Sequence, residues 1–248
     1  MSTRKFMSSI KSLTQKFTSS PKPEEEVTRE SRVYQRFDLQ HSNLFQAHLP
    51  DGSTAPLLDL SFGGLRLGTV PEQDSIPIVI SVLGRKINSQ IGVTHRGSQF
   101  IGSHFDKKEA ALLTFLQPLL GALQQGLSMR RIEGESLKDS TRKKFEWVLR
   151  GEGPTDLLIA STAKPTEEVL LTFRVDKEYW ELNLKAGLMT TGRTIDDQGS
   201  SARMAHDKDP DPKVIEQAIL ILTGAMAQSE LQPVLGPVVE ELKKKIGY

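Results

Sequence analysis

The 248-residue chain contains no cysteine, which excludes disulfide bonds, thiolate catalysis and zinc held by thiolates. It has no apolar run close to the ~20 residues that cross a bilayer, and no continuous apolar core of a secretory signal near its start. The formal net charge of +1 gives no reason to expect nucleic-acid binding. We therefore expect a soluble cytoplasmic protein without a nucleic-acid partner.

Recognisable catalytic patterns are also missing. The five histidines show no H-x-x-x-H spacing for a metal, and neither a G-x-S-x-G turn nor a Walker phosphate loop occurs. We accordingly expect no enzymatic activity, no resident cofactor and no metal site.

Two short polar motifs carry most of the functional information. Arg32 and Arg36 form R-x-x-x-R, and Asp59, Ser61 and Gly64 form D-x-S-x-x-G at a predicted strand end. Arginine forks bind phosphate and the O6/N7 edge of guanine, while a carboxylate accepts from N–H donors. Each motif alone is common, because charged faces and turns select these residue types. Together they fit a phosphorylated guanine.

This pair of motifs, in this order, resembles the PilZ domain, the bacterial receptor module for cyclic di-GMP. Around it, short β-type segments at 65–67, 77–84, 91–97 and 99–105 alternate with Gly, Asn and Asp, which is typical of a small antiparallel barrel. The resemblance covers about residues 28–127. It implies a PilZ-type β-barrel followed by a helix, with cyclic di-GMP as the ligand.

The resemblance also implies roles for the motif residues. Arg32 and Arg36 would grip the phosphates and the guanine edges, and Asp59 would accept from guanine N–H groups. Ser61 would hydrogen-bond the ligand or brace its loop. Gly64 would supply backbone space and a conformation closed to side chains.

Two positions near these motifs extend the prediction. Arg96 lies on a strand that could flank the bound base, so we include it as a further candidate. Ser31 stands where some relatives carry another arginine that favours an intercalated nucleotide dimer, which leaves the nucleotide stoichiometry open.

Residues 1–27 form a predicted basic tail and linker. Within residues 4–17, Phe6, Ile10, Leu13 and Phe17 repeat at helical spacing opposite basic side chains. An amphipathic helix there would make a weak contact with a membrane surface or a partner. The narrow stripe and short length favour a disordered tail instead.

After the barrel we predict a helix that begins at the N-cap Asp106 and runs over 110–123, kinked or interrupted by Pro118. Its strongly apolar face makes self-association a reasonable expectation. Residues 128–144, polar and basic, read as a linker or helical connector.

Residues 145–248 predict a second α+β domain of unrecognised family. Strands are expected at 145–150, 156–160, 169–175 and 179–184, followed by a long loop or a mobile segment over 187–211. A helix should begin at Pro212 with Asp211 as N-cap, and a last helix should cover 237–245. The whole fold class is thus α+β, a barrel plus helix followed by a β-meander and helices.

These observations favour a cyclic di-GMP receptor that changes conformation and signals through a protein partner. One alternative is a PilZ-fold adaptor that no longer depends on nucleotide. Another is an enzyme in the second domain that uses the loop over 187–211, although only the length of that loop suggests it.

Overall fold

The computed structural model describes residues 34–106, 109–132, 137–175, 178–195 and 203–248. Residues Val33–Tyr248 group into one compact unit. Its chain order is an antiparallel barrel, a helix, a second antiparallel sheet and two C-terminal helices, which confirms the predicted fold class.

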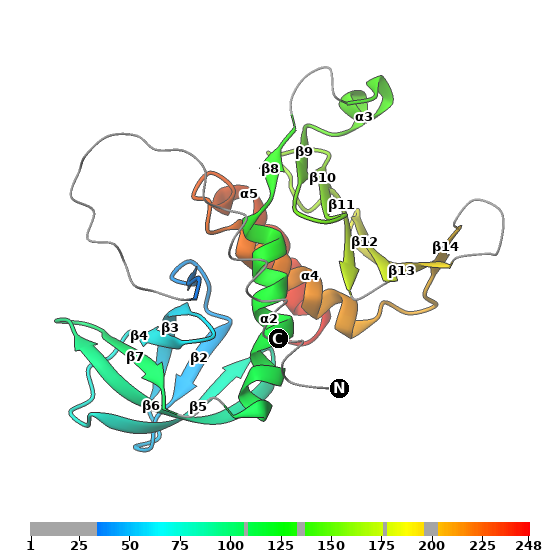
Figure 1. Cartoon of the computed structure of the whole chain (residues 1–248). Coiled ribbons are helices and arrows are strands. Elements are labelled where there is room, and N and C mark those ends of the chain that lie inside the picture. Colours follow the sequence, from blue (N-terminus) through cyan, green and yellow to red (C-terminus); the bar gives the residue numbers. More distant parts are fainter. Residues whose placement is uncertain (1–33, 107–108, 133–136, 176–177, 196–202) are drawn as a thin grey trace. The chain divides into compact units, whose positions relative to one another are not determined.

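The barrel contains the six strands β2 to β7, arranged in the order β3-β2-β5-β6-β7-β4 and closed by pairing of β3 with β4 (Figure 1). Their bounds are β2 (Phe45–His48), β3 (Thr54–Leu60), β4 (Gly64–Leu67), β5 (Ser75–Val82), β6 (Arg85–Arg96) and β7 (Ile101–Phe105). The short strand β1 (Phe37–Asp38) pairs with the end of β3. Closure leaves no open edge between β3 and β4.

Alternation along the strands fills the barrel. In β5, Ile76, Ile78 and Ile80 are buried while the residues between them are not, the period-2 pattern of a half-buried strand. The β3–β4 register shifts at Leu58, directly before Asp59. This bulge lets Asp59 face away from the core although Leu57 and Leu60 are both buried in it.

Helix α2 (Ala110–Leu127) follows the barrel without interruption at Pro118. The predicted interruption is wrong because Pro118 is exposed, so water can bind the carbonyl that loses its partner, while the alternative, a kink, stays a prediction. The prediction of Asp106 as the N-cap is also wrong, since the N-cap is Glu109, without a side-chain cap bond. Asp106 instead accepts from Ser75 Oγ at 3.0 Å.

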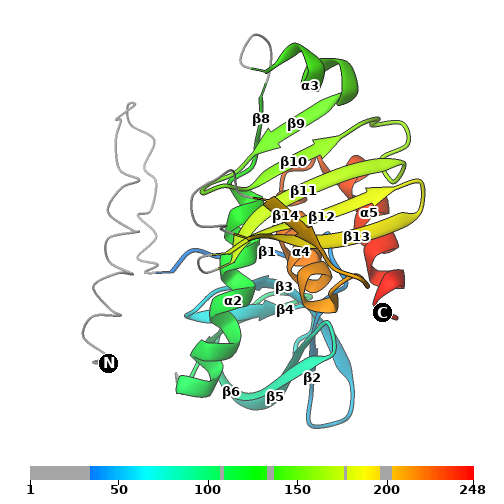
Figure 2. The same cartoon turned by 90° about the vertical axis from the view of Figure 1, so that its right-hand side faces the viewer.

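The second sheet follows the order β14-β13-β12-β11-β10-β9-β8 and is antiparallel throughout. Its strands are β8 (Arg130–Arg131), β9 (Trp147–Arg150), β10 (Asp156–Ile159), β11 (Glu168–Val175), β12 (Glu178–Lys185), β13 (Leu188–Ile195) and β14 (Arg203–His206). Helices α4 (Pro212–Ala225) and α5 (Gln232–Lys245) lie on one face of this sheet (Figure 2). The four strands expected at 145–184 are confirmed.

The long loop expected over 187–211 is wrong, because strands β13 and β14 occupy much of it. Ala186 and Gly187 both have positive φ, 49° and 79°, the geometry of a tight two-residue hairpin turn. Strand β13 then pairs with β12 from Lys185↔Leu188 to Trp180↔Arg193. Hairpin pairing with β12 therefore makes a strand of a segment whose residues are mostly polar.

Helix α4 begins at the predicted residue, whereas helix α5 begins earlier than predicted. Asp211 Oδ1 accepts from the backbone N–H of Lys213 at 2.8 Å, which confirms the predicted cap. Helix α5 starts at Gln232, before the predicted residue 237, and Pro237 lies inside it. The short helix α3 (Asp139–Lys144) lies in the predicted connector.

Two glycines bring α2 and α4 into very close contact. A Cβ added at Gly126 would lie 1.8 Å from the carbonyl oxygen of Ile221, and one at Gly224 would lie 2.1 Å from that of Leu123. A single cluster of buried apolar residues includes barrel, helix and second-sheet side chains. No helix in the described part of the chain is both long and apolar enough to cross a membrane.

Candidate functional site

The D-x-S-x-x-G segment forms the turn between β3 and β4, and Ser61 holds it together. Its Oγ accepts from the backbone N–H groups of Gly63 and Gly64, both at 3.2 Å, and donates to the Gly64 carbonyl at 3.1 Å. The Ser61 N–H donates to the same carbonyl at 2.9 Å. Ser61 is 3% exposed and braces the turn, which is one of the two roles predicted for it, while a hydrogen bond to the ligand stays a prediction.

Gly64 is required by the approach of two strands. A Cβ at this position would lie 2.0 Å from the Ser103 carbonyl oxygen of β7 and 2.8 Å from His104 Cα. Gly64 is absent from the positive-φ residues of the described chain, so the expected special backbone conformation is wrong. Gly64 does leave room beside its backbone, as predicted, but strand β7 fills that room.

Asp59 and Arg36 meet at the end of the barrel. Arg36 Nη1 donates to Asp59 Oδ1 at 2.7 Å, and the two side chains are 26% and 9% exposed. Arg36 and Asp38 lie two residues apart in an extended segment, on the side opposite the buried Phe37. Since Asp38 pairs in register with Asp59, the local geometry directs Arg36 across the strand to that carboxylate.

A second cation, Arg66, also reaches Asp59. Arg66 and Asp59 are register partners on β4 and β3, and Arg66 Nε lies 3.0 Å from Asp59 Oδ2. Nε is buried but lacks the geometry of a hydrogen bond, so the contact is an ion pair. The guanidinium carbon lies 5.3 Å from the ring centroid of Phe100, a cation–π distance.

Aromatic rings border both sides of this charged group. The Tyr34 ring covers the turn, since a Cβ at Gly63 would meet Tyr34 Cδ2 at 3.0 Å. Its centroid is 6.4 Å from that of Phe62. On the other side, the His95 and Phe100 rings lie 5.7 Å apart. The site is thus a buried carboxylate paired with two arginines, with the Phe100 ring against Arg66 and the Tyr34 ring beside the turn.

Arg96 belongs to a different arrangement. Its guanidinium donates to the carbonyl oxygens of Pro71, Glu72 and Gln73 and to Asp74 Oδ1, the last at 2.8 Å. These bonds hold the β4–β5 loop, and none of them involves the D-x-S-x-x-G turn. The structure therefore does not bring Arg96 together with the other candidates.

Several predictions lie outside the described residues. They concern Arg32, Ser31 and the basic segment at 4–17, including its contact with a membrane surface. The structure consequently places only one of the two R-x-x-x-R arginines, Arg36.

Sequence reasoning missed Arg66 and Phe100. Counting outward from the turn would have found Arg66, because a loop from Ser61 to Gly64 places Leu60 opposite Leu65 and Asp59 opposite Arg66. Phe100 gave no such signal, since its contact depends on how the β6–β7 turn folds over Gly97.

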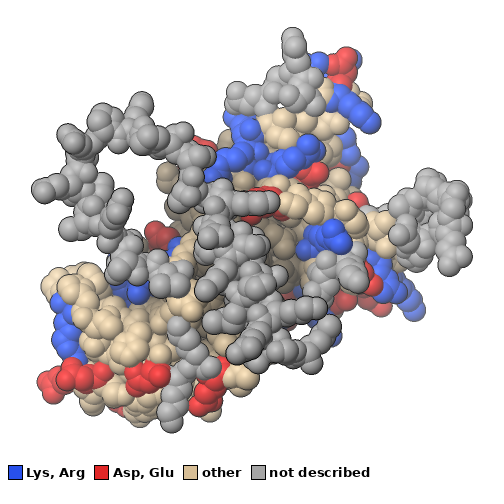
Figure 3. Space-filling view, in the orientation of Figure 1, with Lys and Arg blue, Asp and Glu red and all other residues tan. Residues whose placement is uncertain are grey.

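Basic side chains also gather over β8 and β9 (Figure 3). Their charges are engaged within the chain: Arg150 Nε donates to Asp156 at 2.7 Å, and Arg130 Nη1 donates to the Leu127 and Met129 carbonyls. Acidic side chains are interspersed in the same view, so this region is no single-sign patch.

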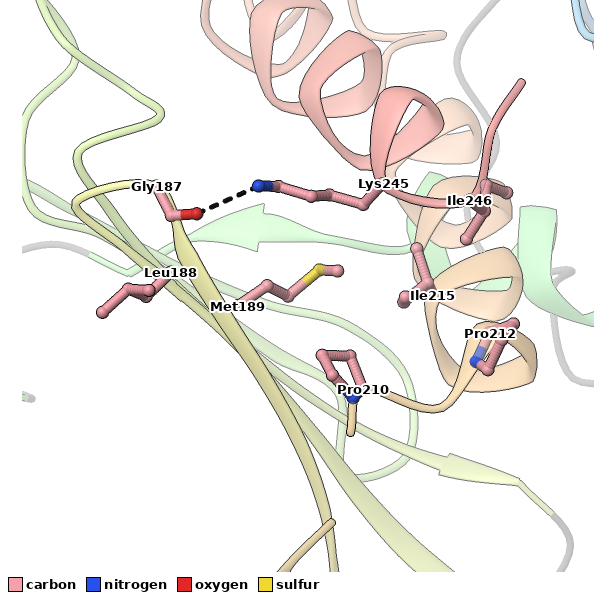
Figure 4. Close-up of a pocket in the computed structure, with 8 residues that line it drawn as sticks. All are labelled: Gly187, Leu188, Met189, Pro210, Pro212, Ile215, Lys245 and Ile246. Carbon is pink, nitrogen blue, oxygen red and sulfur yellow. Dashed lines mark hydrogen bonds between the residues drawn. The ribbon is translucent and has the colours of Figure 1, made fainter. Parts of the chain in front are cut away.

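A pocket of about 270 Å³ lies where the β12–β13 turn meets α4 and α5 (Figure 4). Its lining is Gly187, Leu188, Met189, Pro210, Pro212, Ile215, Lys245 and Ile246. Lys245, the one titratable side chain of that lining, donates to the Gly187 carbonyl at 3.1 Å. Among the described residues, no three His, Asp or Glu side chains cluster to hold a metal ion.

Comparison with known proteins adds little to this geometry. No protein-family model and no curated protein sequence matches the chain. Among solved structures it is similar to the PlzA protein of Borreliella burgdorferi, determined in complex with c-di-GMP, at 11% identity over 73% of this chain and 86% of that chain. The TM-score of this match is 0.22.

Proposed function

We propose that the protein is a cyclic di-GMP receptor of the PilZ type that signals through a protein partner. The observation that carries the proposal is the meeting of Arg36 with Asp59, 2.7 Å apart, beside a turn braced by Ser61. Arg36 belongs to one motif and Asp59 to the other, and these two residues lie 23 positions apart in the sequence. Their contact joins the two motifs at one end of the barrel.

The chemistry of the group suits a guanine nucleotide. A carboxylate offers about four lone-pair positions, and Arg36 and Arg66 each occupy one oxygen of Asp59. Acceptor capacity therefore remains for guanine N–H donors. Arg36 is 26% exposed and can turn toward a phosphate, where a guanidinium binds with two parallel hydrogen bonds.

Arg32 completes the proposed site. Arg32 lies outside the described residues, and the proposal gives it the role of the second guanidinium of the R-x-x-x-R motif. Two guanidiniums would then act on one ligand, and two phosphates of cyclic di-GMP give each of them a target. Binding would change the conformation of the protein, and a protein partner would recognise the nucleotide-bound form.

Isothermal titration with cyclic di-GMP tests the proposal. We expect the wild-type protein to bind with micromolar or tighter affinity. Arg32→Ala or Arg36→Ala removes a charge-assisted contact worth about 1–3 kcal/mol, which corresponds to a loss of about 5- to 150-fold in affinity.

A matched control is available in Arg85→Ala. Arg85 also pairs with a carboxylate, Glu216, at 3.0 Å, but this pair joins β6 to α4 and involves no motif residue. Affinity in this variant should equal that of the wild type. Absence of binding in the wild type would refute the receptor assignment and favour a nucleotide-independent adaptor. Equal affinity in the Arg36 and Arg85 variants would refute the placement of the nucleotide site at Arg36 and Asp59.

A further inference from the structure

Asp59 has more positive charge around it than the two motifs supply. The D-x-S-x-x-G and R-x-x-x-R patterns account for Arg36, whereas Arg66 belongs to neither. Yet Arg66 Nε lies 3.0 Å from Oδ2, on the oxygen that Arg36 does not touch. Asp38 is the register neighbour of Asp59 on β1, so a second negative charge also faces this group.

The position of Arg66 is fixed by two independent contacts. The β3–β4 register places it opposite Asp59, and Phe100 lies 5.3 Å from its guanidinium carbon. Neither contact involves Arg36. Arg66 therefore stays in place whether or not Arg36 moves.

Moving Arg36 to a phosphate has an electrostatic cost. The Asp59 side chain is 9% exposed, and a largely buried carboxylate that loses its counter-ion is strongly destabilised. If Arg36 were the sole cation, binding the nucleotide would strip Asp59 of its compensation. A second arginine on the other oxygen removes that conflict.

We propose that Arg66 is a positioning residue of the nucleotide site: it balances and orients Asp59 while Arg36 turns from Asp59 to a phosphate of cyclic di-GMP. The inference rests on the proposed function. Arg66 makes no contact with the ligand in this mechanism and acts entirely through Asp59. Its effect on affinity should therefore depend on the carboxylate being present.

The β3–β4 hairpin does not need Arg66 for its own stability. Leu57, Leu60, Leu65 and Leu67 of the two strands are fully buried, and they set the register together with the Ser61-braced turn. Replacement of Arg66 should consequently leave the barrel folded, and its effect should appear in ligand affinity.

A double-mutant cycle on affinity tests this role. Cyclic di-GMP is titrated into the wild type, Arg66→Gln, Asp59→Asn and the double variant. We expect Arg66→Gln to weaken binding about 10- to 100-fold in the wild-type background, since each tenfold is about 1.4 kcal/mol. In the Asp59→Asn background the same change should alter affinity less than about twofold. Arg66→Lys, which keeps the charge, should recover most of the loss.

The outcomes separate the possible roles of Arg66. Equal losses in both backgrounds would mean that Arg66 touches the nucleotide itself, and the positioning role would be wrong. A drop in melting temperature with unchanged affinity would make Arg66 structural only, and the positioning role would again be wrong. Arg85→Gln controls for loss of an exposed guanidinium. A wild type without measurable binding refutes the proposed function first, and the positioning role with it.

Discussion

Gly64→Ala should destabilise the barrel more than a Cβ added at any other glycine near the β3–β4 turn. A Cβ there would lie 2.0 Å from the Ser103 carbonyl oxygen, and 2.9 Å from the carbon of the same carbonyl. Both atoms are backbone, so no side-chain rotation relieves the clash. An ordinary contact begins at 3.4 Å, and β4 and β7 must therefore part by about 1.4 Å (3.4 minus 2.0).

Such a separation breaks part of the barrel closure. Gly64 pairs with His104 in the β4–β7 ladder, and the Phe105 N–H donates to the Gly63 carbonyl at 3.1 Å. Lengthening these contacts by more than 1 Å removes about two hydrogen bonds, each worth about 1 kcal/mol net. Adding the strain of overpacking, we expect Gly64→Ala to lower the free energy of unfolding by about 3 kcal/mol.

Urea denaturation followed by circular dichroism measures this loss. With a slope of about 3 kcal/mol per molar urea for a chain of this size, the midpoint should fall by about 1 M. Gly121→Ala is the matched control, because Gly121 lies in α2 with nothing within 4 Å of the added Cβ. This variant should gain about 0.5–1 kcal/mol from helix propensity. Equal midpoints for the two variants would contradict the close approach of β4 and β7.

Two further predictions concern the helices and the second sheet. Gly224→Ala should lower the free energy of unfolding by at least about 2 kcal/mol in the same assay, since its Cβ would meet the Leu123 carbonyl at 2.1 Å; an unchanged midpoint would contradict the tight α2–α4 contact. The pKa of Glu168 is lowered, first by the hydrogen bond from Lys144 and then by charge attraction from Lys144 and Lys185. A lowered carboxyl pKa stabilises the folded state above the unfolded pKa and stops doing so as pH falls through the folded value. Glu168→Gln should thus cost about 0.5 kcal/mol near pH 7, and the difference from the wild type should shrink as the pH falls through the folded pKa of Glu168; a difference that does not shrink in acid would contradict the ion pair.

Local signals predicted much of the fold. The N-cap at Asp211 with Pro212 behind it marked the start of α4, and alternation marked strands such as β11 and β12. Strand β13 escaped prediction because its residues are mostly polar, and pairing with β12 decides its structure. Pro118 predicted an interruption that does not occur, because the exposed position lets α2 continue through it.

The candidate site was predictable only where its residues are neighbours in sequence. One turn contains Asp59, Ser61 and Gly64, and the D-x-S-x-x-G spacing predicts that turn. Arg66 and Arg96 are both arginines on barrel strands, yet one pairs with Asp59 and the other with the β4–β5 loop. Strand register and loop placement separate them, and both depend on how distant segments pack.

The crossing of α2 and α4 has a consequence for how the protein unfolds. Backbone atoms of the two helices touch with no side chain between them, at Gly126 on one side and Gly224 on the other. Separating the barrel from the second sheet would expose this seam and the apolar cluster continuous with it to water. We therefore expect neither half to melt ahead of the other, so that heat and denaturant act on residues 34–248 as one cooperative structure.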